Sequence, residues 1–170
     1  MIKLNTPLTK KDIRALKAGR EVLLSGILFA FRDKAHKTLC SLEQMPLDLK
    51  GQILYYMGPT PTRPGKICGS CGPTTSARMD KYCGNIIKKT GIIGIIGKGP
   101  RCQEANGHMR GKVVYFAAFG GLGALSAKCV TSLRAVCFKD YGAEAVFKLR
   151  VKDMPLIVAQ DFDGNNIYGD

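Results

Sequence analysis

The stretch at residues 58–76 constrains the fold more than any other part of this sequence, because glycine and proline recur along it. Residues 58–65 alternate proline with glycine and threonine, and Gly69, Gly72 and Pro73 extend the same character. Proline lacks a backbone N–H and glycine favours turns, so neither a long helix nor a central strand can cross the middle of the chain. We therefore predict a stiff, turn-rich loop with regular elements on both sides.

Hydrophobic patterning predicts these flanking elements. Before the loop we predict a helix capped by Thr9 and ended by Gly19, a buried strand at residues 21–31 bent at Gly26, a short helix ended by Pro46, and a strand at residues 53–57. After it we predict a helix with Met79, Tyr82, Cys83, Ile86 and Ile87 on one face, and strands at residues 91–96 and 113–119. A second helix after Gly120 and Gly121, with Leu122, Leu125, Cys129, Leu133 and Val136 buried, precedes strands at residues 145–151 and 155–159. The pattern is typical of a single mixed α/β domain over residues 1–170.

The charge balance indicates an anionic counterpart. The chain has 26 Lys and Arg against 13 Asp and Glu, a formal net charge of +13. Residues 51–110 contribute much of the excess, with nine basic against two acidic residues and no long block of like charge. Nucleic acid, an anionic membrane, an acidic subunit and an anionic substrate all fit such a surface.

Two further features bear on location. No apolar run approaches the ~20 residues that a membrane-spanning helix needs. The first residues have no basic segment leading into an apolar stretch, so a secretory signal is not indicated and we expect a cytoplasmic protein.

The cysteines do not form a recognisable framework. Their number, seven, is odd, which argues against a set of structural disulfides. Cys68 and Cys71 have the Cys-x-x-Cys spacing of a redox pair or half a zinc site, but no second such motif follows and Cys83 or Cys102 would match no zinc ribbon. Buried, structural thiols are the simpler interpretation.

The strongest local feature for chemistry is residues 69–80, where glycines give way to a predicted helix start. Backbone amides there are open to a ligand, and the helix N-terminus favours a carboxylate or phosphate. Thr74, Thr75 and Ser76 offer hydroxyls, which also serve as helix caps, and Arg78 offers a planar fork suited to a carboxylate. An anion site and a plain capped helix with a solvated arginine are about equally compatible with this segment.

Two more cations follow predicted strands. Lys98 stands between glycines at a strand end, where α/β proteins commonly present functional groups, and its surroundings do not fit a phosphate-binding loop for nucleoside triphosphates. Arg32 directly follows the buried strand at residues 21–31, although an Arg32–Asp33 surface pair is the plainer interpretation. His36 is expected to be a helix residue that packs or hydrogen-bonds locally rather than a metal ligand. Together the cations predict a pocket for a small di- or tri-anion, with no nucleophile and base beside it: half of an active site.

These residues resemble a known family. The segments Tyr56–Pro61, Gly72–Asp80 and Gly97–Gly99, together with the Arg32-Asp33-x-x-His36 turn, resemble the β subunit of iron–sulfur-dependent class I fumarate hydratases and L(+)-tartrate dehydratases. The similarity covers nearly the whole chain. It implies a swivelling β/β/α domain with a mixed sheet, in which the glycine-rich central loop meets the substrate.

The resemblance also implies the chemistry. A partner α subunit would hold a 4Fe–4S cluster, whose open iron acts as a Lewis acid, and this chain would bind no metal. Arg32, Arg78 and Lys98 match positions that bind substrate carboxylates, and Thr74 matches a threonine that assists proton transfer. Gly72 and Thr75 belong to the same substrate-binding element. The implied reaction is reversible hydration of fumarate to (S)-malate, or dehydration of L-tartrate, and the chain alone would be inactive.

Cys68 and Cys71 depart from the family, and we do not assign them as cluster ligands. Two other classes compete with the hydro-lyase interpretation. One is a basic nucleic-acid-binding module, against which the absence of tryptophan and the placement of the aromatics in strands both count. The other is a zinc or redox protein built on Cys68 and Cys71. We expect a small dicarboxylate and an α subunit as partners, and neither nucleic acid nor membrane.

Overall fold

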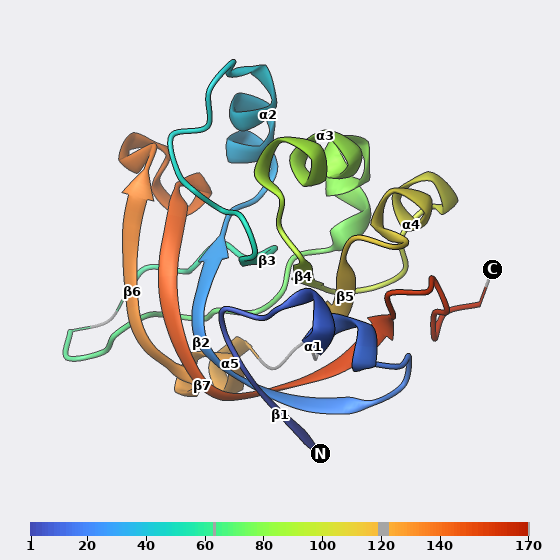
Figure 1. Ribbon diagram of the computed structural model, residues 1–170. Helices are drawn as coiled ribbons and strands as arrows, with labels where there is room; N and C mark the ends of the chain where they lie inside the picture. Colours follow the sequence, from blue (N-terminus) through green and yellow to red (C-terminus); the bar gives the residue numbers. More distant parts are fainter. Residues whose placement is uncertain (63, 119–122, 170) are drawn as a thin grey trace.

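A computed structural model describes residues 1–62, 64–118 and 123–169. Within these residues seven strands form one mixed sheet, and helices α2, α3 and α4 lie together on one side of it (Figure 1). The elements are, in order, β1 Ile2–Asn5, α1 Lys10–Ala15, β2 Glu21–Ala30, α2 Asp33–Ser41, β3 Ile53–Tyr55, the 3₁₀ helix η1 Ser76–Met79, α3 Asp80–Thr90, β4 Gly94–Gly97, α4 Gln103–Met109, β5 Val114–Ala117, α5 Gly123–Lys128, β6 Val130–Cys137, the 3₁₀ helix η2 Lys139–Glu144, and β7 Val146–Gln160.

The sheet closes on itself. Its order is β1-β2-β3-β4-β5-β7-β6, and β2 also pairs with β7. Strands β2, β3, β4, β5 and β7 therefore form a ring, with β1 attached to β2 and β6 attached to β7 outside it. The contacts β1–β2–β3–β4–β5 are parallel and those of β7 are antiparallel. The predicted mixed α/β class is confirmed, with a barrel-like closure that periodicity alone does not reveal.

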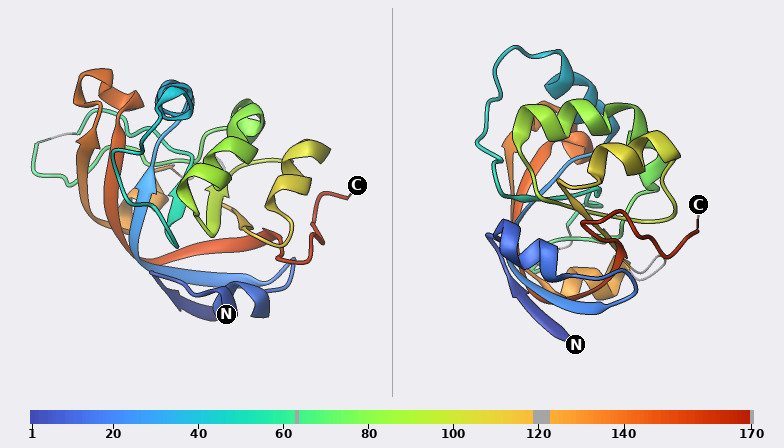
Figure 2. Two further views of the ribbon diagram at one scale, coloured as in Figure 1. Left: turned by 45° about the horizontal axis from the view of Figure 1, so that its top comes forward. Right: turned by 45° about the vertical axis from the view of Figure 1, so that its right-hand side comes forward.

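The core has two parts, one on each face of the parallel strands. Along β3, Ile53 and Tyr55 pack into the interior of the ring, whereas Leu54 packs against the helices. This alternation follows from the two-residue period of a strand. Figure 2 shows the same layering from two other directions, with the helical layer on one side of the strands. No helix among the described residues is long and apolar enough to cross a membrane.

Several predicted elements agree with the structure. Thr9 caps α1 in a reciprocal capping box with Asp12. Strand β2 has a bulge at the predicted bend, where Gly26 has φ +112° and a Cβ there would lie 2.2 Å from Thr6 Oγ1. Of the predicted helix face, Met79 in η1 and Cys83, Ile86 and Ile87 in α3 are buried, whereas Tyr82 is half-buried. Gly19, however, does not cap α1, because the helix ends at Ala15, and α2 ends at Ser41, well before Pro46.

The second long helix was a wrong prediction. Helix α5 stops at Lys128, and Leu133 and Val136 lie on strand β6, which pairs antiparallel with β7 (Leu133 opposite Leu149). The helical spacing of these apolar residues was coincidental, and pairing with a distant strand prevailed over it. Phe119, Gly120, Gly121 and Leu122, on which the prediction also depended, lie outside the described residues.

The predicted strands at residues 145–151 and 155–159 are one strand, β7. Its register against β2 shifts between Val151 and Met154, and Asp153 there has φ +49°. The chain bends at this bulge and continues, with Pro155 opposite Leu23. Strand β1 and helix α4 were not predicted, because β1 is short and largely exposed and α4 lacks an apolar stripe longer than two turns.

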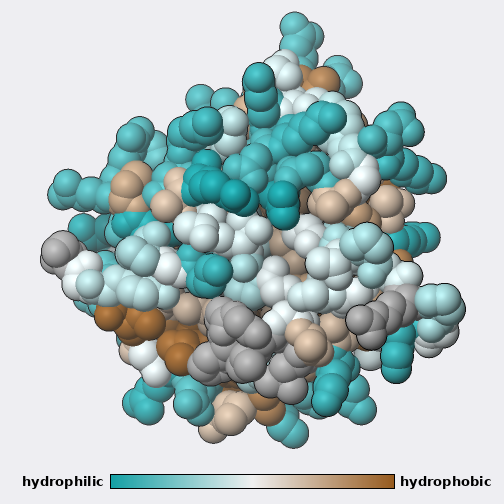
Figure 3. All heavy atoms as spheres, turned by 180° about the vertical axis from the view of Figure 1, so that it is seen from behind, coloured by the Kyte–Doolittle hydropathy of each residue, from teal (hydrophilic) through white to brown (hydrophobic). Residues whose placement is uncertain are grey.

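The rear surface is largely hydrophilic, and hydrophobic residues gather on one side of it, next to the residues drawn in grey (Figure 3). This agrees with the chain's high content of Lys and Arg.

Candidate functional site

The carboxyl ends of three parallel strands bring the predicted site segments to one edge of the sheet. Ala30 on β2 pairs with Tyr55 on β3, which pairs with Ile96 on β4. Arg32 follows the end of β2, and Lys98 follows the end of β4. Ends of parallel strands meet at the same edge, which is where open α/β sheets place ligand sites. The predicted location of both cations at strand ends is thus confirmed.

The segment Thr74–Ser76 lies between the ends of β3 and β4. The Thr74 N–H donates to the Tyr56 carbonyl at 2.8 Å, and the Ser76 N–H donates to the Lys98 carbonyl at 3.0 Å. Thr75 forms a parallel bridge with Lys98. Thr75 is exposed and Thr74 is half-buried, so both lie at the surface of the edge. The structure therefore brings Lys98 together with Thr74 and Thr75, from which it is more than 20 residues away in the sequence.

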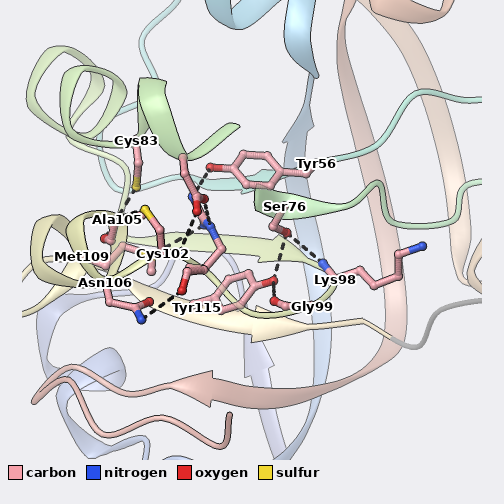
Figure 4. A network of polar contacts seen from close by, with 12 residues as sticks. Tyr56, Ser76, Cys83, Lys98, Gly99, Cys102, Ala105, Asn106, Met109 and Tyr115 are labelled. Carbon is pink, nitrogen blue, oxygen red and sulfur yellow. Dashed lines mark hydrogen bonds and ion pairs between the residues drawn. The ribbon is translucent and has the colours of Figure 1, made fainter. Parts of the chain in front are cut away.

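Ser76 is fully buried and has a different role from the predicted cap. Its Oγ accepts the Lys98 N–H at 2.9 Å and lies 2.9 Å from the Tyr115 hydroxyl, which also donates to the Gly99 carbonyl at 2.8 Å. Figure 4 shows these contacts, with the Lys98 side chain pointing away from them. A Cβ at Gly97 would lie 1.9 Å from Ser76 Oγ, so the close approach requires glycine there. Ser76 thereby fixes the backbone that carries Lys98.

The helix start is also different from the prediction. No side chain caps η1 or α3, and α3 begins only at Asp80, after the 3₁₀ turn. The hydroxyls of Thr74 and Thr75 therefore do not lie at the N-terminus of α3, and Arg78 lies in the 3₁₀ turn. The idea of an anion bound by the helix N-terminus does not fit this geometry, whereas an anion bound by side chains does.

The two arginines are held by acidic residues from other elements. Arg78 Nη2 lies 3.1 Å from Asp33 Oδ2, in a pair that is about half exposed. Arg32 Nε donates to Glu144 Oε1 at 2.7 Å, and its Nη2 contacts the same oxygen. Because Asp33 neighbours Arg32, the first pair also links η1 to the start of α2. Arg32 and Arg78 therefore belong to the same edge, with Glu144 supplied by η2.

Lys98 and Gly72 complete the predicted set. Within the described part of the chain, no acidic residue forms an ion pair with Lys98 Nζ. Gly72 has a packing reason for lacking a side chain, because a Cβ there would lie 3.2 Å from the Gly123 Cα. A similar constraint applies at Gly58, where a Cβ would lie 2.8 Å from Arg32 Cδ. The Arg32 side chain thus rests against the start of the glycine- and proline-rich loop.

Sequence reasoning missed the ion pair behind this edge. Arg101 has a fully buried side chain whose Nε pairs with Asp80, while the other Asp80 oxygen accepts the Cys102 N–H at 2.7 Å. Its Nη2 lies 3.5 Å from the Tyr56 hydroxyl. Burial opposes the charge, but Tyr56, Cys83 and Asp80 raise the pKa of Arg101 above its ordinary value, so it stays protonated. The one signal in the sequence was Asp80 itself, an acidic residue in an otherwise apolar helix face.

His36 supports the other end of the edge. It is fully buried against Phe31, Tyr56 and Tyr82, and its Nδ1 lies 2.7 Å from the Arg32 carbonyl. Burial lowers its pKa to about 4, so the ring is neutral at pH 7 and Nδ1 carries the proton that the carbonyl accepts. The prediction that His36 packs or hydrogen-bonds locally is confirmed by its contact with the Arg32 carbonyl, although its ring packs against residues outside α2.

The thiols show no metal-binding arrangement in the part of the chain that is described. There, no three His, Cys, Asp or Glu side chains gather at distances suited to a metal ion. Cys68 and Cys71 are buried free thiols within the glycine- and proline-rich loop, and Cys83 is buried in the helical layer.

The protein-family model described as "Fumarase C-terminus" matches residues 1–170. A Methanocaldococcus jannaschii protein provisionally named L(+)-tartrate dehydratase subunit beta is 43% identical, over 95% of this chain and 88% of its own length. The L(+)-tartrate dehydratase subunit beta of Escherichia coli K12 is 33% identical, over 98% of this chain and 86% of its own length.

Other relatives are longer. A Geobacillus stearothermophilus protein provisionally named fumarate hydratase class I is 37% identical over the whole of this chain, which spans 34% of that protein. The chain therefore corresponds to about a third of that relative and to most of the tartrate dehydratase subunits.

Proposed function

The chain belongs to the Fumarase C-terminus family, and on this premise we propose that it is the β subunit of a heteromeric hydro-lyase that interconverts fumarate and (S)-malate. Its relatives are named as fumarate hydratases and as β subunits of L(+)-tartrate dehydratases, both of which are hydro-lyases. Residues 1–170 would act as one swivelling domain whose glycine-rich loop closes over substrate held by an α subunit. The cytoplasmic location stays a prediction.

A 4Fe–4S cluster belongs to this proposal, as the iron–sulfur Lewis acid that polarises the substrate hydroxyl. The residues of this chain do not fit it: among those described, no three potential ligands come together, and Cys68 and Cys71 are a pair without a third partner. We therefore propose that the α subunit holds the cluster.

The cations of the edge supply the binding of the substrate. Glu144 contacts the Nε and Nη2 groups of Arg32, and no other described residue accepts a hydrogen bond from this guanidinium. The remaining N–H donors are therefore available to a substrate carboxylate. Arg78 is held by an exposed pair with Asp33, which is worth ~0–1 kcal/mol, so a substrate carboxylate displaces Asp33 at small cost. Lys98 adds a third cation from the end of β4. Two carboxylates of a small dicarboxylate are thus met by three charged donors.

Thr74 supplies the hydroxyl nearest to the chemistry in this proposal. Its backbone is fixed by the Tyr56 carbonyl, and the neighbouring Thr75 is fixed by Lys98. A hydroxyl on a fixed segment between two strand ends is well placed to assist proton transfer at a carbon held by Arg78 and Lys98. Gly72 and Thr75 would position this segment and contact the substrate through the backbone and the side-chain hydroxyl.

The observation that carries the proposal is the insertion of Thr74–Ser76 between the ends of β3 and β4 beside Lys98, with Arg78 in the 3₁₀ turn that follows. The test is to co-express the chain with its α subunit, reconstitute the complex under anaerobic conditions, and follow fumarate by ultraviolet absorbance. We expect turnover by the complex and none by the chain alone. Full activity of the isolated chain, or a complex that acts on neither fumarate nor L-tartrate, would contradict the proposal.

L-tartrate is the second candidate substrate. The observation in its favour is that the relatives covered over most of their length, at 43% and 33% identity, are named as tartrate dehydratase β subunits. Both substrates carry two carboxylates, and the cationic edge binds either. The ratio of kcat/KM for fumarate and L-tartrate in the reconstituted complex decides between them.

A further inference from the structure

The loop that leads into the candidate site carries a pair of thiols that the proposed reaction does not use. Cys68 and Cys71 are separated only by Gly69 and Ser70, so both thiols belong to one short segment of the loop. Both are buried, at 8% and 0% exposure. The Cys-x-x-Cys spacing is the one that dithiol oxidoreductases use, because it allows the two sulfur atoms to bond within a single turn of chain.

The backbone around the pair is held in a fixed shape. The Thr60 N–H donates to the Ser70 carbonyl at 3.1 Å, and the Ser70 N–H donates to Thr60 Oγ1 at 2.7 Å. A Cβ at Gly69 would lie 2.3 Å from Thr60 Oγ1, so the two arms of the loop are in direct contact. The backbone that carries both cysteines is therefore held in place by the fold.

One thiol is open to small molecules and the other is not. Cys68 lines a hollow of about 690 Å³, together with Lys66 and with Ala127 and Lys128 of α5. Cys71 does not line it, and burial raises the pKa of its thiol. The two lysines make the hollow positively charged, which favours a small molecule bearing carboxylates. A small molecule in the hollow would therefore react with Cys68 first. Cys71 would then act as the resolving thiol, which attacks the mixed disulfide formed on Cys68.

The pair is joined to the candidate site through Cys71. Its carbonyl accepts the Tyr55 hydroxyl at 2.6 Å, and its N–H donates to the Gly123 carbonyl at 3.2 Å. Gly72 and Pro73 alone separate it from Thr74. A disulfide that shifted Cys71 would therefore also shift Thr74–Ser76, the segment that lies between the ends of β3 and β4.

We propose that Cys68 and Cys71 are a redox-active dithiol that an anionic low-molecular-weight disulfide, of the class of oxidised glutathione, converts to an intramolecular disulfide that slows turnover. The effect on turnover rests on the proposed function, whereas formation of the disulfide does not.

The exchange proceeds in two steps. The Cys68 sulfur attacks one sulfur of the small disulfide, forms a mixed disulfide and releases one small thiol, which takes the Cys68 proton. The Cys71 sulfur then attacks Cys68 Sγ, forms the Cys68–Cys71 bond and releases the second small thiol, which takes the Cys71 proton. Two protein thiols are oxidised and one small disulfide is reduced to two thiols. Disulfides of this kind inside cells are usually transient and serve catalysis or redox sensing.

The chain offers a clean readout of the bond. Trypsin cleaves after Lys66 and Arg78, and the peptide between them contains Cys68 and Cys71 and no other cysteine. The reconstituted complex is treated with oxidised glutathione without oxygen, alkylated, digested and analysed by mass spectrometry. We expect this peptide to lose two hydrogen atoms and to escape alkylation, and to carry two alkyl groups after dithiothreitol. A peptide that stays fully alkylated, or that carries only glutathione on Cys68, overturns the proposal.

Matched variants distinguish the effect of oxidising Cys68 and Cys71 on turnover from the effect of oxidising other groups in the complex. Cys68→Ser removes the entering thiol, and Cys102→Ser removes an exposed thiol while keeping a side chain that caps α4. Turnover of the wild-type and C102S complexes should fall about tenfold or more on oxidation and return with dithiothreitol, because displacing a positioning group by about 1 Å costs up to 100-fold. The C68S complex should keep its activity under the same treatment. Equal loss in C68S and wild type would show that oxidation acts elsewhere and would overturn the link to turnover.

The two proposals fail in different ways. A complex that acts on neither dicarboxylate, yet whose peptide forms the disulfide, contradicts the hydro-lyase assignment and leaves the dithiol standing. A complex that is active and whose peptide never oxidises contradicts the dithiol alone.

Discussion

Two arginine–aspartate pairs lie close to the candidate site and differ sharply in their surroundings. Arg101 and Asp80 pair behind the edge with side chains 0% and 9% exposed, whereas Arg78 and Asp33 pair on the edge at 52% and 39%. In the buried pair neither charge has water as an alternative partner, so removing one leaves the other unsatisfied. In the exposed pair water and a ligand can replace either partner. The buried pair therefore maintains structure, and the exposed pair is suited to exchange with a carboxylate.

The same contrast extends to the neighbours of each pair. The buried layer, consisting of Arg101, Asp80, Tyr56 and His36, fixes the backbone on which the exposed edge is built. We expect substitutions in this layer to reduce stability, and substitutions on the edge to reduce turnover without unfolding the protein.

The largest effect is expected from Arg101→Met. It leaves the Asp80 carboxylate buried without its partner, which typically costs ~3–5 kcal/mol of unfolding free energy. Urea denaturation followed by circular dichroism measures the loss, and Arg78→Met, which breaks the exposed pair, is the control, with an expected loss below ~1 kcal/mol. Adding Asp80→Leu to Arg101→Met should restore part of the stability. Similar losses for the two arginine variants would remove the distinction between the pairs.

The next effect is the pH dependence that comes from His36. Its pKa in the folded protein is about 4, below the ordinary 6.5. The unfolded chain therefore binds more protons between these values, so stability is fully present above pH 6.5 and is lost as the pH falls towards 4. The loss amounts to about 3 kcal/mol. His36→Asn should lack this slope, and NMR titration of the His36 ring in the wild type should give a midpoint near 4. A midpoint near 6.5 would contradict the burial of a neutral ring.

A smaller effect, confined to turnover, is expected from Arg78→Ala in the reconstituted complex. Loss of a charge-assisted contact to a carboxylate costs ~1.5–3 kcal/mol, so kcat/KM should fall roughly 10- to 150-fold. The free energy of unfolding should change by less than ~0.5 kcal/mol, as is usual for a surface position. Arg20→Ala, at the other end of β2, is the matched control and should leave kcat/KM unchanged. Equal kinetics for the two variants would remove Arg78 from the proposed site.

The smallest effect is expected from Asp33→Asn. It releases Arg78 from an exposed pair worth ~0–1 kcal/mol, so KM for the dicarboxylate should fall by up to about fivefold while kcat changes little. Steady-state kinetics at low ionic strength give the clearest measurement, since salt weakens exposed pairs. A rise in KM would show instead that Asp33 holds Arg78 in the orientation that binding requires.

Local patterns were sufficient for part of this molecule. The bend at Gly26, the capping of α1 by Thr9 and the apolar face of α3 were predicted because each depends on residues within a few positions of one another. The placement of Arg32 and Lys98 at strand ends was predicted for the same reason. Their roles toward substrate were implied by a family resemblance and are to be tested by the variants above.

Other features were beyond such patterns. Strand β6 has apolar residues at helical spacing, and only its pairing with β7 makes it a strand. The partner of Arg32 is Glu144, 112 residues away. The partner of Asp80 is Arg101, which lies 21 residues further along, just before α4. Neither pair leaves a trace in the spacing of the sequence, because a distant partner constrains neither residue's neighbours.

The sequence by itself determined the alternation of short apolar strands and helices, the interruption at residues 58–76, and the residue types gathered on either side of it. Those properties depend on backbone preferences and on the period of apolar residues, both of which are local. Only the tertiary structure decided that β2 and β7 close the sheet, that Ser76 is buried against Lys98, and which carboxylate each arginine meets. These outcomes depend on which surfaces exclude water together, and that is a property of the whole packed chain.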